Sequence, residues 1–275
     1  MKVKIAVIGF ALLSLTCEQS TENPKHDPTA TRLTLTGDCA SFTWSRNSSK
    51  IAVTRKNDLW IFDAGSMKWE QITSRNAGGR VIGRSTWSPD GTQLVFEADS
   101  PLLYKLDVAS KDTTPLPIVG FYPRWSVDGK SLFFVRDGYL AKYSFATQTA
   151  RNLLEYRYRD YDLFPDSNGI LLLWPTSYFN LEKGEMKRLD GGYVGSQARI
   201  VSISPDGRHF AYDNIASYYD EVDVLDVFSF SDSSSTYVPN SENCGSPGWS
   251  HDSKRIAYLY KQNIWMKELS TFLNK

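Results

Sequence analysis

Six short apolar runs recur along the chain at regular intervals, each preceded by a polar turn. They occupy residues 51–53, 94–96, 132–134, 170–172, 210–212 and 256–258. Alternation of apolar and polar residues would predict a strand with one solvated face, whereas a continuous apolar run predicts a strand that is covered on both faces. We therefore expect six short, fully buried strands.

The turn before each run has its clearest copy in Trp87-Ser88-Pro89-Asp90-Gly91. Proline presets φ at the second turn position, aspartate accepts hydrogen bonds from nearby backbone amides, and glycine tolerates the positive φ that leads into the next strand. The six copies begin at Trp44, Trp87, Trp125, Leu163, Ile203 and Trp249, about 41 residues apart. A strand-only repeat of this length predicts an all-β, six-bladed propeller of four-stranded antiparallel blades.

The third and fourth strands of a blade follow its buried run. Residues 59–62 and 264–266 are expected to form third strands, and residues 70–73 a fourth strand. The last repeat ends before a fourth strand, whereas residues 31–36 form a strand-like segment ahead of the first repeat. We expect this segment to pair with the last blade, because closing the ring removes exposed sheet edges.

These frames resemble the TolB-type propeller repeat, which also occurs in the propeller domains of dipeptidyl peptidases. The resemblance rests on the Trp-Ser-Pro-Asp-Gly cores and covers nearly all of the chain after residue 30. TolB itself has an additional α/β domain before its propeller, for which this sequence leaves no room, so we do not expect the chain to be TolB. The resemblance implies a protein of the cell envelope as the class of partner.

The amino terminus predicts export. Lys2 and Lys4 precede an apolar run over residues 5–15, which is too short to span a bilayer as a helix, and Cys17 follows. We expect residues 1–16 to be a signal peptide, residues 17–30 a tether lipidated at Cys17, and residues 31–275 the propeller. An ordinary cleaved signal with an incidental cysteine is the alternative, because Leu15 departs from the small residue that a lipobox prefers. The predicted location is the periplasm or cell surface of a Gram-negative-type envelope, with membrane contact through the lipid anchor only.

The two other cysteines occupy equivalent positions. Cys39 lies five residues before Trp44, and Cys244 lies five residues before Trp249. Because ring closure makes the first and last blades neighbours, we predict a disulfide between these cysteines, in keeping with an oxidising compartment. Two buried free thiols in equivalent pockets are the alternative.

Composition narrows the chemistry. The formal net charge is zero, with 31 basic and 31 acidic residues, so no nucleic-acid partner is expected. Three scattered histidines predict no metal site, and no cofactor motif and no Gly-x-Ser-x-Gly elbow occur. The repeated Asp and Trp residues are interpreted as turn and packing residues rather than as a calcium ring or a sugar platform, because they recur at fixed positions of the repeat in separate blades. Carboxylates are numerous enough to leave a paired acid–base site open, although no pair stands out.

A binding site is expected where the repeats differ. Propeller partners commonly dock on the rim formed by the loops that lead into the innermost strands and those that join the middle strands. The first set carries Arg84, Tyr122, Arg159, Tyr161 and Arg199, and the second carries Arg55, Arg136 and Tyr219. Arginine and tyrosine suit binding hot spots, although each is also an ordinary surface residue. Residues 156–161 and the insertion at residues 214–221 form the favoured region.

The sequence therefore favours a non-enzymatic, monomeric envelope lipoprotein that binds a protein or peptide on the rim of its propeller. The alternative is a carbohydrate-active or other hydrolytic propeller with carboxylates in its central channel. A degenerate scaffold with a weak partner interaction is a third reading. Two channel carboxylates at hydrolase spacing between aromatic walls would favour the enzyme.

Overall fold

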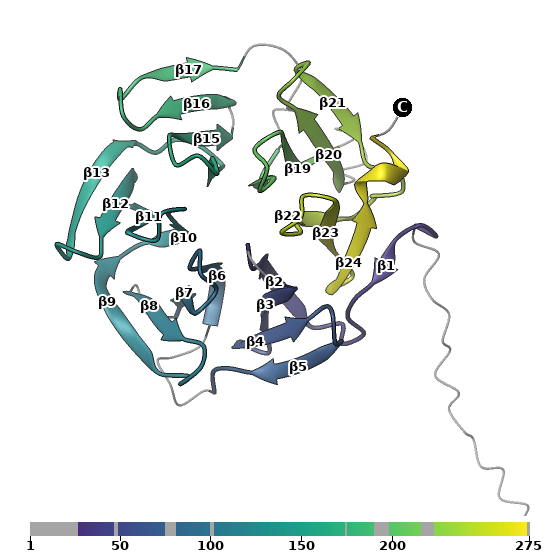
Figure 1. The fold of residues 1–275 in the computed structure, drawn as a ribbon, viewed down its shortest axis with the longest axis horizontal. Coiled ribbons are helices and arrows are strands. Elements are labelled where there is room, and N and C mark those ends of the chain that lie inside the picture. The colour runs from purple at the N-terminus through teal and green to yellow at the C-terminus, as the bar shows by residue number, and fades with distance from the viewer. Residues whose placement is uncertain are drawn as a thin grey trace, which may run out of the picture.

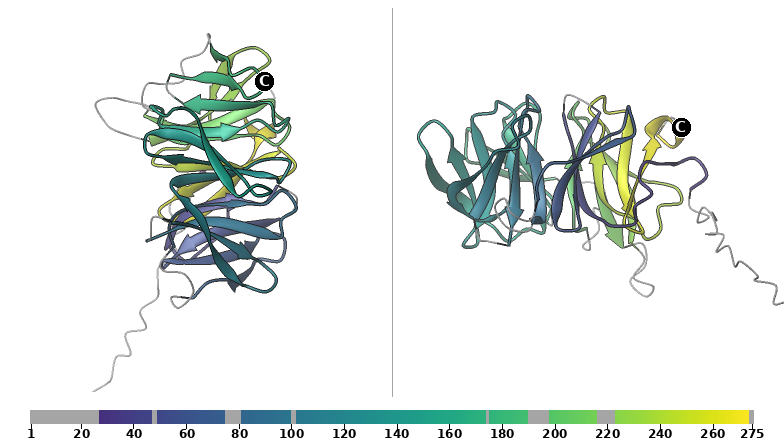
Figure 2. Two further views of the ribbon diagram at one scale, coloured as in Figure 1. Left: turned by 90° about the vertical axis from the view of Figure 1, so that its left-hand side faces the viewer. Right: turned by 90° about the horizontal axis from the view of Figure 1, so that it is seen from below.

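The computed structural model describes residues 27–46, 49–74, 81–99, 102–173, 175–189, 198–215 and 223–273. The predicted signal peptide, Cys17 and Tyr219 lie outside these residues. The described residues form six four-stranded antiparallel sheets arranged radially around a channel, which confirms the six-bladed propeller (Figure 1). Viewed from the side, the blades form a disc (Figure 2).

The strands follow the repeats in chain order. The first three blades contain β2 (Cys39–Trp44), β3 (Lys50–Arg55), β4 (Asp58–Asp63) and β5 (Lys68–Gln71); β6 (Val81–Trp87), β7 (Gln93–Ala98), β8 (Leu102–Asp107) and β9 (Thr113–Val119); β10 (Phe121–Trp125), β11 (Ser131–Arg136), β12 (Tyr139–Ser144) and β13 (Thr149–Glu155). The last three contain β14 (Asp160–Leu163), β15 (Gly169–Leu173), β16 (Ser177–Asn180) and β17 (Met186–Arg188); β18 (Val201–Ile203), β19 (His209–Ile215), β20 (Asp223–Ser229) and β21 (Ser234–Tyr237); β22 (Gly245–Trp249), β23 (Arg255–Tyr260), β24 (Asn263–Glu268) and β1 (Thr31–Arg32). A 3-10 turn, Leu269–Thr271, follows β24.

The amino-terminal strand closes the ring, as predicted. Strand β1 pairs antiparallel with β24 through Thr31 opposite Met266 and Arg32 opposite Trp265. This strand is shorter than expected, because the ladder ends where the Thr34 hydroxyl accepts a hydrogen bond from the Ile264 amide at 2.9 Å. The Thr34 hydroxyl thus takes the place of a backbone carbonyl for the Ile264 amide, while the Ile264 carbonyl still accepts from the Leu33 amide at 2.8 Å.

The repeated hairpins are held by their own side chains. In the second blade, the Ser88 hydroxyl donates to Asp90 at 2.5 Å and accepts from the Gln93 amide at 2.9 Å, while Asp90 also accepts from the Thr92 amide. Equivalent Ser–Asp bonds form in three other blades, at Ser126–Asp128, Ser204–Asp206 and Ser250–Asp252. These bonds show that the recurrent aspartates are turn residues.

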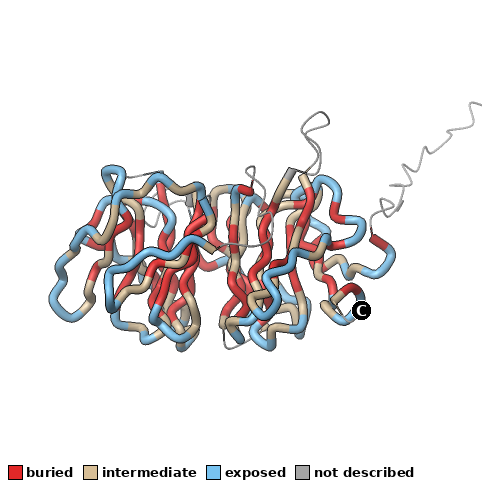
Figure 3. The backbone as a smooth tube through the Cα atoms, turned by 90° about the horizontal axis from the view of Figure 1, so that it is seen from above, coloured by how far each residue is buried: buried red, intermediate tan, exposed pale blue. Residues whose placement is uncertain are grey.

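Two of the repeated tryptophans join neighbouring blades, whereas the indole N–H of Trp125 donates to the Gly129 carbonyl of its own turn at 3.1 Å. The indole N–H of Trp87 donates to the Thr43 carbonyl at 3.1 Å, and that of Trp249 donates to the Ser202 carbonyl at 2.9 Å. Both rings are buried among apolar residues. Each apolar run of a second strand is also buried, which places the core between the blades (Figure 3).

The disc has two distinct faces. Because neighbouring strands are antiparallel, the innermost strands β2, β6, β10, β14, β18 and β22 all begin on one face, where the second strands end. We call this the rim face. The opposite face carries the Ser-Pro-Asp-Gly hairpins and is called the hairpin face.

The predicted disulfide is not formed. Cys39 and Cys244 are both free, buried thiols. The sulfur of Cys39 lies 3.5 Å from the Thr36 hydroxyl, whereas that of Cys244 lies 3.7 Å from the Glu242 carbonyl. The two cysteines belong to separate hydrophobic clusters, so equivalent positions in neighbouring blades did not bring their sulfurs together. Burial raises the pKa of the Cys244 thiol well above its usual value.

Candidate functional site

The predicted binding residues that the structure describes lie at or near the rim face, as the antiparallel topology requires. Three of them, Arg84, Tyr122 and Tyr161, meet beside the channel. They come from the innermost strands of the second, third and fourth blades. The remaining ones are dispersed around the rim.

Tyr122 occupies an unusual backbone conformation at the centre of this cluster. Its φ is 56°, in the left-handed region, within a bulge where β10 shifts register against β11. Two buried side chains hold it there: Glu97 accepts a hydrogen bond from the Tyr122 amide at 2.6 Å, and the Tyr161 hydroxyl donates to the Tyr122 carbonyl at 2.6 Å. A bulky residue in this region costs on the order of 1–3 kcal/mol, and such strain clusters at binding sites.

Arg84 connects Tyr122 to the channel wall. Its guanidinium lies 4.8 Å from the centre of the Tyr122 ring and bonds the carboxylate of Asp160 at 2.5 Å. The ring of Tyr122 remains 37% exposed. Arg84 and Tyr122 therefore present one fixed surface on the rim face.

Tyr161 does not lie on the rim surface, which corrects its expected placement. The residue is fully buried, and its ring packs edge-on against Tyr156 with the centroids 6.0 Å apart. Its contribution is to position Tyr122 through the hydroxyl. In the favoured region at residues 156–161, Arg157 and Arg159 are instead exposed.

Three charged residues that the sequence analysis missed complete the channel wall. Arg124 lies 3.4 Å from Asp162 and 3.8 Å from Asp160, so its guanidinium bridges both carboxylates. Asp160 and Asp162 stand three and one residues before the start of the fourth repeat copy, and Arg124 stands one before the third. The position one residue before each copy lines the channel cavity in all six blades, and the position three residues before it lines the cavity in four, because alternate residues of a strand share one face. Reading the repeats at these two positions would have found them.

Fixed donors occupy both channel aspartates. The carboxylate of Asp160 accepts from Arg84 and from the Val201 amide at 3.0 Å, while Asp162 accepts from the amides of Leu163 at 2.9 Å and Ile203 at 2.8 Å. Asp160 is also fully buried. Both carboxylates therefore bind neighbouring blades together.

Glu97 is the other buried acid of the cluster. Burial raises its pKa, although hydrogen bonds from the Tyr122 and Arg84 amides and the charge of Arg84 oppose the shift. The side chain lies directly over Gly83, where an added Cβ would come within 1.9 Å of the carboxylate and 2.9 Å of the Glu97 Cβ. Glycine at position 83 thus makes room for Glu97.

Three more large side chains are exposed at strand ends on the rim face. Val119 at the end of β9 is 47% exposed, Phe121 at the start of β10 is 50% exposed, and Tyr139 at the start of β12 is 41% exposed. We call Val119, Phe121, Tyr122 and Tyr139 the rim patch. Large apolar and aromatic residues exposed on one face are typical of a binding surface.

The other predicted residues serve their own blades. Arg55 is stacked 4.8 Å from both Trp60 and Trp69 and pairs with Asp38 at 2.8 Å. Arg136 bonds Asn152 at 3.0 Å, and Arg199 pairs with Asp213 and Asp223. Arg159 is exposed. The structure does not bring these four arginines into the cluster around Tyr122.

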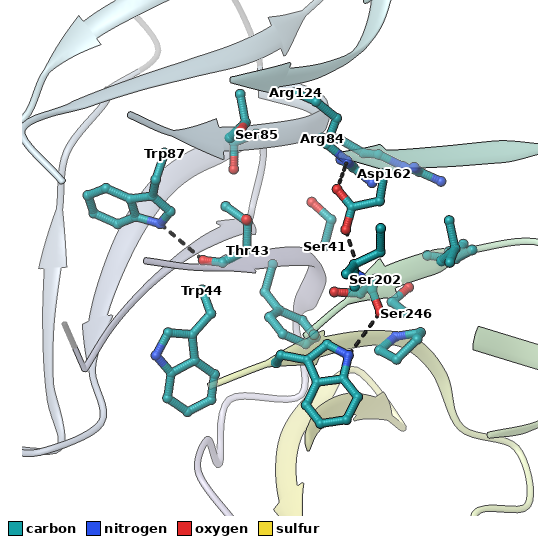
Figure 4. Close-up of a pocket in the computed structure, with 18 of the residues that line it drawn as sticks. Ser41, Thr43, Trp44, Arg84, Ser85, Trp87, Arg124, Asp162, Ser202 and Ser246 are labelled. Atoms are coloured by element: carbon teal, nitrogen blue, oxygen red, sulfur yellow. Dashed lines mark hydrogen bonds and ion pairs between the residues drawn. The ribbon is translucent and has the colours of Figure 1, made fainter. Parts of the chain in front are cut away.

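A cavity of about 140 Å³ opens inside the channel, between the innermost strands of all six blades (Figure 4). Its charged lining consists of Arg46, Arg84, Arg124 and Asp162. Trp44, Trp87 and Trp249 form much of the apolar wall, and Ser202 and Ser246 contribute hydroxyl groups. The channel is therefore polar and basic on one side and aromatic on the other.

Comparison with solved structures supports the fold, and none of the comparisons assigns a family. No protein-family model matches the sequence, and no curated protein matches it. Among solved structures, a protein assigned as TolB from Agrobacterium tumefaciens matches with a TM-score of 0.64 and 13% identity, over 83% of this chain and 89% of that one. A chain of the mitotic checkpoint complex matches with a TM-score of 0.61 and 13% identity, over 97% and 99%. An oligogalacturonate lyase from Vibrio parahaemolyticus matches with a TM-score of 0.59 and 11% identity, over 86% and 79%. At such identities the likeness to TolB is one of architecture.

Within the described part of the chain, no helix has the length and hydropathy needed to cross a membrane. None of the groups of three or more His, Cys, Asp or Glu side chains in this part is arranged to hold a metal ion.

Proposed function

We propose that this protein is a non-enzymatic binding module of the cell envelope, which takes an apolar segment of a protein or peptide partner on the rim patch. The observation that carries the proposal is Tyr122. Its backbone is strained, its ring is exposed, and two buried side chains and a stacked arginine fix its position. A chain that needed only to fold would gain stability by placing glycine or asparagine there.

The composition of the rim patch agrees with a polypeptide partner. Phe121 and Val119 offer purely apolar area, while Tyr122 and Tyr139 add rings with a polar end, a combination found at binding hot spots. The arginine beside Tyr122 is already paired with Asp160, so it holds the tyrosine rather than attracting a charged partner. Apolar side chains of the partner would thus supply most of the affinity.

The hydrolytic alternative has weaker support. The channel does contain two carboxylates, Asp160 and Asp162, but both hold blades together through backbone amides and arginines. A general acid must exchange its proton with a substrate within hydrogen-bond reach. The fully buried Asp160 has no such access.

The envelope location is proposed on the amino-terminal sequence. A signal peptide followed by a lipidated Cys17 would tether the propeller to a membrane through residues 17–30. Mass spectrometry of the mature protein tests this part separately, since a mature chain without lipid on Cys17 would refute the anchor and leave the rim patch untouched.

The binding proposal is tested by capture from crosslinked envelopes with Tyr122→Asn. Asparagine tolerates the left-handed backbone, so the variant removes the ring and preserves the fold. Met67→Asn is a matched control, because Met67 also has a left-handed φ, of 58°, and is 54% exposed in the turn between β4 and β5 on the hairpin face. We expect the same partner to be captured by the parent and by Met67→Asn, and to be lost with Tyr122→Asn. Equal capture by all three would refute the rim patch as the binding surface.

A further inference from the structure

The channel cavity carries an excess of positive charge. Three arginines line it, Arg46, Arg84 and Arg124, together with one carboxylate, that of Asp162. Arg84 is paired with Asp160, Arg124 is shared between Asp160 and Asp162, and Glu97 interacts electrostatically with both of these arginines. Arg46 is the cavity arginine with which no acid among the described residues forms an ion pair.

Arg46 differs from the other two arginines in having no partner in the described part of the chain. Among the residues that the structure describes, none forms an ion pair or hydrogen bond with its side chain. The residue is only partly exposed, and burial lowers the pKa of its guanidinium although the charge of Asp162 raises it. Taking a charge out of water without a compensating partner is unfavourable, and a bound anion would remove that penalty.

Arg46 is also a departure from the repeat. It stands two residues after the start of the first copy, and the corresponding residues of the other five copies are Pro89, Val127, Pro165, Pro205 and His251. A residue needed for the blade itself would recur, whereas this arginine occurs in one blade. We therefore interpret Arg46 as a residue that serves the cavity rather than the packing of its blade.

The rest of the wall indicates the kind of anion. The hydroxyl groups of Ser202 and Ser246 face the same cavity, and neither has a hydrogen-bond partner within the described residues. A cavity of comparable size, roughly 150 Å³, accommodates benzene, which has six heavy atoms. The planar guanidinium of Arg46 matches a carboxylate in geometry.

We propose that the channel binds a small hydroxy carboxylate, whose carboxylate pairs with Arg46 and whose hydroxyl group bonds Ser202 or Ser246. This site is separate from the rim patch and does not depend on the polypeptide partner. It would make the propeller a receptor for a small metabolite of about six heavy atoms as well as a docking protein.

L-lactate and lactamide are suitable probes, because they have the same number of heavy atoms and differ in charge. Binding is measured by calorimetry and by the shift in melting temperature, for the parent protein, for Arg46→Gln and for Arg208→Gln. Arg208 is an exposed arginine of a hairpin in the fifth blade, and it controls for the loss of one positive charge. Inorganic phosphate serves as an anion of a different class.

We expect lactate to bind the parent and Arg208→Gln, lactamide to bind neither, and Arg46→Gln to lose at least tenfold in affinity for lactate. Without ligand, Arg46→Gln should melt no lower than the parent, because the change removes an unpaired charge rather than a structural contact. Equal effects of lactate and lactamide, or retention of lactate binding by Arg46→Gln, would overturn the proposal. Binding of phosphate without binding of lactate would overturn the assignment to carboxylates.

Discussion

A buried ion pair joins the segment ahead of the closing strand to the last blade, and breaking it should destabilise the whole ring. The Lys267 ammonium on β24 pairs with the carboxylate of Asp27 and donates to the Pro239 carbonyl at 2.8 Å. Asp27 and Lys267 are 2% and 3% exposed. The carboxylate also accepts from the amide and hydroxyl of Thr29, at 2.8 and 2.7 Å. Asp27→Ala removes the negative charge and leaves the lysine buried without it.

The expected loss follows from the desolvation of that lysine. Removing one partner of a buried pair costs about 3–5 kcal/mol, whereas replacing both by apolar residues of similar volume is often neutral. Asp27→Ala should therefore lower the free energy of unfolding by about 3–5 kcal/mol, and Asp27→Leu/Lys267→Met should recover most of this loss. The recovery separates an uncompensated charge from a simple loss of packing.

Acid should narrow the difference between parent and variant, by at most about 1.4 kcal/mol for each pH unit below the unfolded pKa. Burial opposes ionisation of Asp27, but the hydrogen bonds from Lys267 and Thr29 outweigh it and lower the pKa of the carboxyl. A lowered folded-state pKa means that the contribution is complete above the unfolded pKa, about 3.9, and declines as the pH falls below it. Urea denaturation of the mature chain at pH 7 and pH 3 measures both effects. A loss below 1 kcal/mol at pH 7, or a double variant no more stable than Asp27→Ala, would refute the reasoning.

Three further changes test the fold. Deleting residues 31–34 should lower the melting temperature sharply, because β24 would be left as an open edge, and an unchanged melt would contradict ring closure. Gly83→Ala should cost about 1–3 kcal/mol through its clash with Glu97, and adding Glu97→Ala should relieve much of that cost in urea denaturation, whereas no relief would place the strain elsewhere. Cys39 and Cys244 should react with a thiol reagent only after the protein is unfolded, because both side chains are buried. Recovery of a disulfide between them by mass spectrometry would contradict their free state.

The candidate site was only partly visible from the sequence. Arg84 and Tyr122 could be named because they stand at a position where the repeats differ, on a face that the loops of all blades share. The role of Tyr161 was missed, because its place in the chain does not show that its hydroxyl reaches back across a blade boundary to the Tyr122 carbonyl. Equivalent positions of Cys39 and Cys244 predicted adjacency but could not predict sulfur geometry, which depends on the Cβ directions of two separate blades.

The sequence by itself determined the number of blades, the turn chemistry and the closing segment, because all three depend on local patterns repeated about every 41 residues. Only the tertiary structure decided which charges meet in the channel. Arg84, Arg124 and Asp160 are far apart along the chain, and their pairing depends on how six innermost strands converge on one axis. The same convergence leaves Arg46 unpaired among the described residues and Tyr122 exposed, because a repeat specifies each blade but not what its inner edges present to one another.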